Sequence, residues 1–206
     1  MWWAELDALP AAIAAGAAQH GGPAVDPSAQ VHAEALLDDS HGPILIGPGT
    51  IVCRGASIRG PVRIGANCLI GDQAMVRGPV SLGDGVRIGF ATELKNAIVD
   101  ADVAIGPMCF VADSKVETGA YLGAMVRTSN HRLDRATVTV MVDGAPVDTG
   151  REKLGCLIGA GASLGIQVII LPGRIVAAGS LFAPRITIEK NLPAGRYRQA
   201  QRLEAF

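Results

Sequence analysis

Large aromatic side chains are scarce in this sequence. Phe, Trp and Tyr make up 4% of its 206 residues, whereas 49% of the residues are hydrophobic and 26 are glycine. This balance argues against a globular core of large rings and favours a narrow core of stacked aliphatic side chains with tight corners. No apolar run approaches the roughly 20 residues of a membrane-spanning helix. The length suits one well-buried domain.

An excess of charge of one sign is also missing. The chain has 18 Lys and Arg residues against 19 Asp and Glu residues, a formal net charge of −1. Near-neutrality argues against nucleic acid or an anionic membrane as a partner. The Ala-rich first 20 residues lack a basic segment and contain Glu5 and Asp7, so they make a poor secretory signal. We therefore expect a cytoplasmic protein.

The sequence contains instead a repeat of six residues. Ile, Val or Leu occurs at every sixth residue from Ile46 to Leu94, and Gly often follows it. Neither the period of a helix nor that of a flat strand gives this spacing, whereas a parallel β-helix does. Three hexads would form one triangular coil of 18 residues. Its apolar edge is buried only when coils stack about 4.8 Å apart. An all-β solenoid is therefore predicted.

The repeat divides the chain into three predicted parts. Residues 1–24 are expected to form a helical segment and a linker, with one apolar side made of Trp2, Trp3, Leu6, Leu9 and Ile13. Residues 25–190 form the β-helix, with an insertion at residues 126–156 where the spacing of six is absent. The segment VDGAP within the insertion predicts a β-hairpin. Residues 191–206 leave the prism as a polar tail, either a cap or a short helix.

Two further features concern the interior of the predicted prism. The register shortens by one residue after Leu94 and again after Val111, which is expected where a coil bends or ejects a residue. Four cysteines are too few and too scattered for a disulfide framework. Three of them, Cys68, Cys109 and Cys156, occupy equivalent positions that small residues otherwise fill. Buried, unreactive thiols are therefore favoured.

Two segments, GPVRIGANCLIGDQAMVRGPVSLGDGVRIGFATELKNAIV and VDTGREKLGCLIGAGASLGIQVIILPG, carry a family resemblance. They resemble the hexapeptide-repeat acyltransferases, and within them the acetyltransferase domain of the bifunctional sugar-1-phosphate nucleotidyltransferase/acetyltransferases, which make UDP-N-acetylglucosamine. The resemblance runs from Ile44 to about Val176. Only about 40 residues lie upstream, so no nucleotidyltransferase domain is expected.

The resemblance carries several expectations. It implies a left-handed parallel β-helix with an inserted hairpin loop, flanked by short terminal helical segments. It also implies acetyl-CoA as acyl donor and a sugar phosphate or nucleotide sugar as acceptor. The assembly would be a homotrimer with active sites between subunits.

Four residues match the family's functional positions. Arg77 in VRGP and Lys95 in TELKN match an Arg and a Lys that bind the phosphate side of the sugar phosphate, and they lie eighteen residues apart, one coil. Two cations on one edge form an anion site, unless both are merely solvated edge residues. Asn130 in RTSNHRLD matches the Asn of a T-x-N motif, and Lys153 in REKLG is kept. The resemblance thus implies substrate binding by Arg77, Lys95 and Lys153.

The catalytic motif departs from the family pattern. Where the family has HLxYVGDS, this chain has PMCFVADS, so Pro107 replaces the His that acts as general base and Phe110 replaces the Tyr. Tyr121 stands at the position of an Asn, and Ala136 and Thr139 stand where Lys residues are expected. Because proline cannot take a proton, either the reaction is lost or another residue supplies the base.

His131, beside Asn130, is the predicted replacement base. A His with a pKa near ~6.5 suits the deprotonation of an amine, although a solvated loop histidine is the alternative. Cys109 is a weaker candidate because its register places it inward, and Asp113 is expected to fix a coil corner. No His, Cys and Asp cluster has metal-ligand spacing, so no metal is expected.

Three functions stay open on this sequence. The first is a CoA-dependent acyltransferase, with His131 and Asn130 as catalytic residues. The second is a catalytically inactive relative that binds a nucleotide sugar or sugar phosphate and has lost the general base. The third is a purely structural trimer in which the segment with Trp2 and Trp3 docks a partner.

Overall fold

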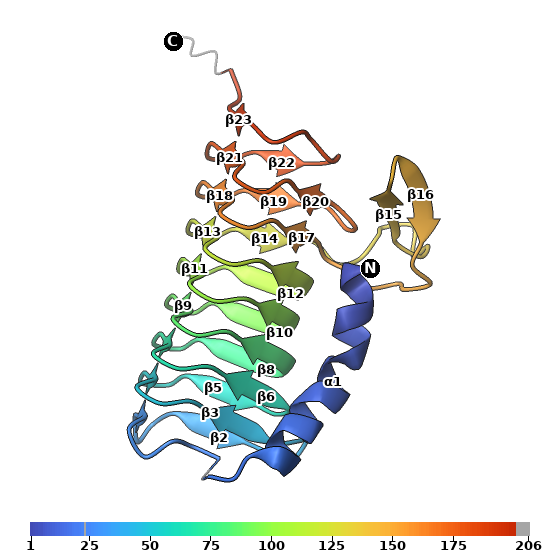
Figure 1. The fold of residues 1–206 in the computed structure, drawn as a ribbon. Helices are drawn as coiled ribbons and strands as arrows, with labels where there is room; N and C mark the ends of the chain where they lie inside the picture. Colours follow the sequence, from blue (N-terminus) through green and yellow to red (C-terminus); the bar gives the residue numbers. More distant parts are fainter. Residues whose placement is uncertain (23, 201–206) are drawn as a thin grey trace.

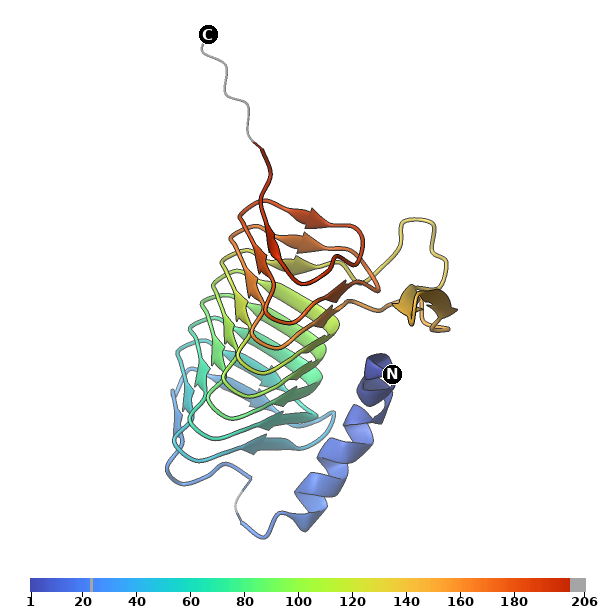
Figure 2. The same ribbon diagram turned by 45° about the horizontal axis from the view of Figure 1, so that its top comes forward.

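The computed structural model describes residues 1–22 and 24–200. These residues form a three-sided prism of stacked coils, a left-handed parallel β-helix, with one α-helix lying along its side (Figures 1 and 2). The predicted all-β fold built on a six-residue repeat is therefore confirmed. Pro23 and residues 201–206 of the expected tail lie outside the described residues.

Each side of the prism is a parallel sheet. The first face consists of β1 (Gln30–Val31), β4 (Ile51–Val52), β7 (Leu69–Ile70), β9 (Arg87–Ile88), β11 (Ala104–Ile105), β13 (Tyr121–Leu122), β18 (Ser163–Leu164), β21 (Leu181–Phe182) and β23 (Arg196–Tyr197). The second face consists of β2 (Leu36–Asp38), β5 (Ser57–Arg59), β8 (Met75–Leu82), β10 (Glu93–Val99), β12 (Phe110–Val116), β14 (Arg127–Thr128), β19 (Ile169–Ile170) and β22 (Thr187–Ile188). The third face contains β3 (Ile44–Ile46), β6 (Val62–Ile64), β17 (Leu157–Ile158) and β20 (Ile175–Val176). The second halves of β8, β10 and β12 bend round a corner to complete it.

The residues that recur every six positions point into the prism. Ile58, Ile70, Leu82 and Leu94 are each 0% exposed. Strands of successive coils pair in register, as β7 does with β9, so each aliphatic side chain stacks on its equivalent. Full burial of such a side chain contributes about 1.5–3 kcal/mol. The stacked column therefore supplies the core that one coil lacks.

Three cysteines share this interior, as predicted. Cys68, Cys109 and Cys156 are buried, whereas Cys53 is partly exposed. Burial raises the pKa of Cys68 and Cys109, and it raises the pKa of Cys156 to about 12. These thiols act as small packing groups.

The two shortenings of the register lie at one corner, between the second and third faces. In β8 the corner contains two residues, Gly78 and Pro79, but in β10 and β12 it contains one, Asn96 or Asp113. Asn96 and Asp113 have φ values of 44° and 50°. Asn and Asp tolerate this left-handed conformation better than other side chains do. The corner therefore stacks an amide directly on a carboxylate.

The insertion begins later than residue 126, where it was expected. Arg127 and Thr128 form β14, which pairs with β12 and β19 inside the prism. Thr128 holds the position six residues after Leu122 and is 0% exposed. Its hydroxyl accepts a hydrogen bond from the backbone N–H of Ala112, at 2.8 Å. The repeat at Thr128 could not be predicted from apolar spacing, because the residue at the core position is polar and its hydroxyl bonds to the backbone.

The predicted hairpin within the insertion is confirmed. Strands β15 (Thr139–Val142) and β16 (Ala145–Asp148) pair in antiparallel fashion. Asp143 and Gly144 join them with φ values of 49° and 81°. Positive φ at both residues is what a two-residue hairpin turn requires, and Asp-Gly supplies it at low cost.

Helix α1 (Trp2–Gln19) confirms the N-terminal helical segment, and its buried side is the predicted one: Trp2, Trp3, Leu6, Leu9 and Ile13. The helix lies against β8, β10 and β12 beside the third face (Figure 2). No helix in the described part of the chain is long and apolar enough to cross a membrane.

Helix α1 also joins the insertion. A second cluster of buried residues contains Trp2, Trp3, Leu6, Val138, Val140 and Leu154. The Lys115 ammonium donates to a Glu5 carboxylate oxygen at 2.7 Å, and the Arg151 guanidinium donates to Asp7 at 2.6 Å. Both tryptophan side chains are buried against the rest of the protein, so they do not form an exposed surface that could dock a partner.

Of the two expectations for the C-terminal segment, a cap or a short helix, the structure shows a cap. Residues 191–200 contain no helix, and β23 pairs with β21 as a further rung of the first face. The ring of Tyr197 stacks on Phe182 with centroids 4.8 Å apart. An aromatic pair and a backbone ladder therefore cap the last coil, and the prism continues past residue 190.

Candidate functional site

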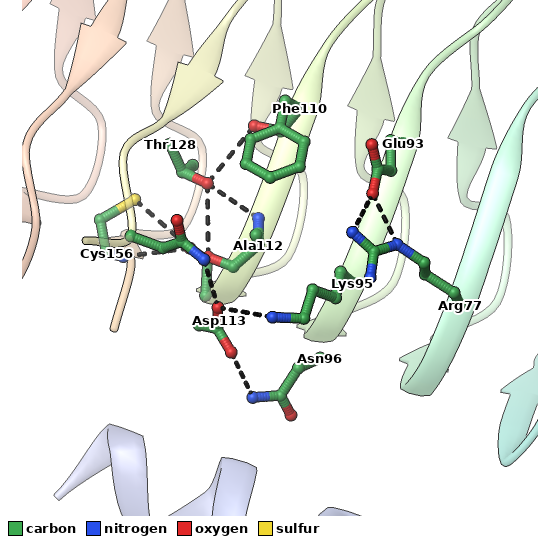
Figure 3. Close-up of polar contacts among 11 residues, drawn as sticks. Arg77, Glu93, Lys95, Asn96, Phe110, Ala112, Asp113, Thr128 and Cys156 are labelled. Atoms are coloured by element: carbon green, nitrogen blue, oxygen red, sulfur yellow. Dashed lines mark hydrogen bonds and ion pairs between the residues drawn. The ribbon is translucent and has the colours of Figure 1, made fainter. Parts of the chain in front are cut away.

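Arg77 and Lys95 lie side by side on the second face, on the adjacent strands β8 and β10 (Figure 3). Each already has an acidic partner. The Arg77 Nε donates to Glu93 Oε1 at 2.6 Å, and the Lys95 Nζ lies 3.5 Å from Asp113 Oδ2. The Arg77 and Glu93 side chains are 41% and 31% exposed. Because such a partly exposed pair contributes only about 0.2–1 kcal/mol, an incoming phosphate can compete for the guanidinium.

Asp113 is the centre of a polar network at the corner of the prism. Its Oδ1 accepts a hydrogen bond from Asn96 Nδ2 at 2.7 Å, and its Oδ2 accepts one from Asn130 Nδ2 at 2.6 Å. Asp113 is only 4% exposed, and a buried carboxylate requires such partners. The network links three successive coils, as Figure 3 shows around Lys95, Asn96 and Asp113. It therefore fixes Asn130 with its amide nitrogen towards Asp113 and leaves its carbonyl oxygen as an acceptor.

His131 follows Asn130 at the point where the chain leaves the prism. Its side chain is exposed, and its backbone forms an antiparallel bridge with Lys153, on the returning end of the insertion. His131 lines a hollow of about 550 Å³, together with residues that include Ser129, Arg132, Leu171, Pro172 and Arg174. That volume lies within the range of small-molecule sites. The structure thus brings Asn130, His131 and Lys153 together at the base of the insertion.

The hollow beside His131 is lined by two arginines, Arg132 and Arg174, and by two carboxylates, Asp134 and Glu189. The Arg174 guanidinium donates to the backbone carbonyl oxygens of Pro172 and Glu189, at 3.1 and 3.3 Å. Burial, and then the charge of Arg132, lower the pKa of Arg174 from its usual value. Arg132 is paired with Asp134, whereas Arg174 has no carboxylate within 4 Å among the described residues. Arg174 is therefore able to bind an anionic group.

Lys153 is the remaining predicted binding residue. Its side chain is exposed, and it forms no ion pair within the described part of the chain. Arg77 and Lys95 thus lie on the second face, Lys153 and His131 lie at the insertion, and Asp113 with Asn130 connects the two groups. Within residues 1–22 and 24–200, no group of three or more His, Cys, Asp or Glu side chains could hold a metal ion.

The two positions where the catalytic motif departs lie at the start of the second face, before the corner that holds Asp113. Pro107 is an exposed residue between β11 and β12 and offers no proton acceptor. Phe110 is in register with Glu93, the partner of Arg77, and so lies on the same face as the predicted anion site. Cys109 is 1% exposed, with its Sγ 3.1 Å from the carbonyl oxygen of Gly123. Its burial argues against a thiolate nucleophile, as expected.

Sequence reasoning missed Glu93 and Asn96, and it gave Asp113 only a role in the corner. The signal for Glu93 and Asn96 was present in TELKN, where both flank Lys95. Asp113 does lie at the corner, as expected, but its carboxylate also holds Asn130 and Lys95. That role could not be read from spacing, because Asp113 and Asn130 are 17 residues apart, and only the shortened coils place them together.

The family model of bacterial transferase hexapeptides (six repeats) matches residues 61–96. The uncharacterized acetyltransferase YaiX of Escherichia coli O6:K15:H31 is 52% identical over 180 residues, which are 87% of this chain and 78% of that protein. A bifunctional sugar-1-phosphate nucleotidylyltransferase/acetyltransferase of Sulfurisphaera tokodaii is 31% identical over 111 residues, which are 54% of this chain and 28% of that protein.

Solved structures of similar architecture include two acyltransferases. The UDP-N-acetylglucosamine acyltransferase of Campylobacter jejuni is 16% identical, with a TM-score of 0.45, over 81% of this chain and 71% of that chain. The polysialic acid O-acetyltransferase OatWY is also 16% identical, with a TM-score of 0.43, over 83% of this chain and 77% of that chain.

Proposed function

Because the chain belongs to the hexapeptide-repeat acetyltransferase family, we propose that it transfers an acetyl group from acetyl-CoA to a sugar phosphate or nucleotide sugar. The observation that carries this proposal is the network around Asp113. It holds Asn130 beside Lys95 at one end and beside the hollow of His131 at the other. This arrangement supports the proposal because it connects the predicted anion site with the hollow along one edge of the prism.

Each residue has a role in the proposed reaction. Arg77 and Lys95 bind the phosphate of the acceptor by charge-assisted hydrogen bonds. His131 accepts the proton of the attacking amino or hydroxy group, whose lone pair forms a bond to the thioester carbon. The carbon–sulfur bond then breaks, and CoA leaves as a thiolate that takes up a proton. The carboxamide of Asn130, held by Asp113, orients the reacting groups, and Lys153 contributes positive charge.

The hollow is the proposed binding place for part of the donor. Its volume of about 550 Å³ accommodates part of acetyl-CoA, and the Arg174 guanidinium, held only by backbone carbonyl groups, suits its phosphates. Acetyl-CoA would supply the activated acyl group, and the chain's own residues would position it and remove the proton.

We also propose a homotrimer with the active sites between subunits, acting in the cytoplasm. The family resemblance supports the assembly. The four free cysteines suit a reducing compartment. Sedimentation equilibrium giving the mass of three chains would support the trimer, and the mass of a single chain would contradict it.

The experiment that tests the reaction is an assay of CoA release. Acetyl-CoA is incubated with a panel of amino-sugar phosphates and nucleotide-linked amino sugars, and free thiol is measured. His131→Gln is expected to lower kcat/KM about 100-fold, because general base catalysis contributes about that much or more. His32→Gln, which changes an exposed histidine of the first coil, is the control and leaves the rate unchanged. Release of no CoA with any acceptor would contradict the proposal.

A second function is favoured by one specific observation: Pro107 stands where the resemblance places the general base, and its side chain cannot accept a proton. The chain would then be an inactive relative that binds a nucleotide sugar or sugar phosphate and regulates another process. Calorimetry that detects such binding, lost in Arg77→Ala, together with no CoA release, would support this alternative over the acetyltransferase.

A further inference from the structure

The tripeptide Arg-Gly-Pro occurs twice, at residues 59–61 and 77–79. The two copies are 18 residues apart, one coil of the prism. Arg59, at the end of β5, is in register with Arg77 of β8, and Arg77 is in register with Lys95 of β10. Three cations therefore stack on one edge of the second face. Only Arg77 and Lys95 belong to the site described above.

The two Arg-Gly-Pro corners stack closely on each other. A Cβ atom at Gly78 would collide with the backbone carbonyl oxygen of Pro61, and one at Gly60 would collide with that of Gly42. The glycines are therefore required by the approach of the neighbouring coil. Because the backbones repeat so closely, Arg59 and Arg77 leave the face at equivalent points, about 4.8 Å apart along the prism.

The charges of the three cations are compensated unequally. Arg77 is paired with Glu93, and Lys95 with Asp113. Arg59 is exposed and forms no hydrogen bond or ion pair through its side chain with any residue that the structure describes. Its register neighbour Asp38 accepts hydrogen bonds from the backbone N–H and the hydroxyl of Ser40, at 3.1 and 2.6 Å. These bonds are the main cause of the lowered pKa of Asp38, and the charge of Arg59 contributes least to it.

We propose that Arg59 is a further anion-binding residue, and that Arg59 and Arg77 together bind two adjacent phosphoryl groups. A guanidinium is a planar fork of donors that matches one phosphoryl group. The fork of Arg59 has no partner among the described residues, and on Arg77 a phosphoryl group would displace the Glu93 carboxylate. A monophosphate would occupy one fork, whereas a diphosphate would span both coils. The acceptor is therefore a diphosphate-linked sugar and not a sugar monophosphate. This choice of substrate class rests on the proposed acetyltransferase function, but the anion site itself does not.

Calorimetry on the full-length chain tests the site with two probes, inorganic pyrophosphate and inorganic phosphate. The wild type is expected to bind pyrophosphate about tenfold more tightly, since one additional charge-assisted contact contributes at least that factor. Arg59→Gln is expected to weaken pyrophosphate binding about tenfold and phosphate binding less than about twofold. Arg59→Lys keeps the positive charge but lacks the planar guanidinium, so its affinity for pyrophosphate is expected to lie between those of the wild type and Arg59→Gln.

The matched control is Arg63→Gln, which removes an exposed arginine of β6 on the third face of the same coil. It is expected to leave both affinities unchanged. Because the Arg59 side chain is exposed, its variants should have the same Tm as the wild type. Equal affinity for the two probes, pyrophosphate binding that Arg59→Gln does not weaken, or no pyrophosphate binding at about 10 mM would each overturn the proposal.

The outcome is separable from the test of the proposed function. Pyrophosphate binding that depends on Arg59, without CoA release, would support the anion site and contradict the proposed acetyl transfer. CoA release with equal kcat/KM for monophosphate and diphosphate acceptors would leave the acetyltransferase standing and remove the role of Arg59 in selecting the acceptor.

Discussion

Replacing Asp113 by Asn removes one charge from the centre of the corner network and changes little else. The two side chains have the same shape, and both tolerate the left-handed φ of 50° at this position. However, the carboxylate accepts hydrogen bonds from two amide nitrogens, those of Asn96 and Asn130. An Asn side chain has a single acceptor oxygen, so its own NH2 group would face one of these donors. One partly buried donor then loses its partner.

The magnitude follows from these contacts. A hydrogen bond to a charged group contributes about 1.5–3 kcal/mol, and one such bond is lost outright. The Lys95 side chain is 25% exposed and can turn to water, so the loss of its 3.5 Å contact adds less than about 1 kcal/mol. The total is about 3 kcal/mol. For a chain of this length each kcal/mol lowers the Tm by about 2–4 °C, so Asp113→Asn should melt about 6–12 °C below the wild type.

Thermal unfolding followed by circular dichroism measures this difference. Asp102→Asn is the matched control, because Asp102 is an exposed corner residue with a similar φ of 58°. Its Tm is expected to stay within about 2 °C of the wild type, as is usual for surface substitutions. If Asp113→Asn and Asp102→Asn melt at the same temperature, the reasoning about the buried carboxylate is refuted.

Further predictions concern the core, the helix and the thiols. Ile70→Asp places an unpaired charge in the prism and should abolish cooperative folding, whereas Ile70→Val should lower the free energy of unfolding by about 1 kcal/mol. A thermal melt of Ile70→Asp like that of the wild type would contradict the inward placement of this residue. Deleting residues 1–20 uncovers the insertion, so hydrogen exchange should accelerate over residues 131–153 while the strands around Ile70 keep their protection; unchanged exchange in the insertion would argue against the role of α1. In native protein a thiol reagent should modify Cys53 alone, because the other three thiols are buried. The reaction should become faster as pH rises, since burial raises the pKa of Cys53 and the thiolate forms only at higher pH. Modification of two or more thiols would contradict the burial of Cys68, Cys109 and Cys156.

Much of the fold follows from the spacing of aliphatic residues. Residues such as Ile58 and Leu82 predict the β-helix, because a strict period of six buries all of them only in that geometry. The amphipathic helix and the Asp-Gly hairpin are local features, and they too were predictable. Thr128 was not, since a polar residue in a core position depends on a backbone partner from another coil. The final rung at Tyr197 likewise depends on a contact with Phe182 that no local pattern contains.

The candidate site was predictable only in part. Matching residues placed Arg77 and Lys95 in adjacent coils, because register in a solenoid converts sequence distance directly into spatial neighbourhood. The carboxylate partners of these cations were not foreseen. Asp113 meets Lys95 and Asn130 only after two corners have each lost one residue, which alters the register of everything that follows. Arg59 is not among the positions that the resemblance matches, and the register of β5 with β8 is what places it beside Arg77.

Mass spectrometry of the acceptor after incubation with acetyl-CoA is the most direct test of acetyl transfer at this corner. With a diphosphate-linked amino sugar, the wild type should add the mass of one acetyl group to the acceptor for each CoA released. His131→Gln should still bind both ligands but acetylate the acceptor about 100-fold more slowly. An acceptor of unchanged mass with the wild type, or equal acetylation by His131→Gln, would contradict the account.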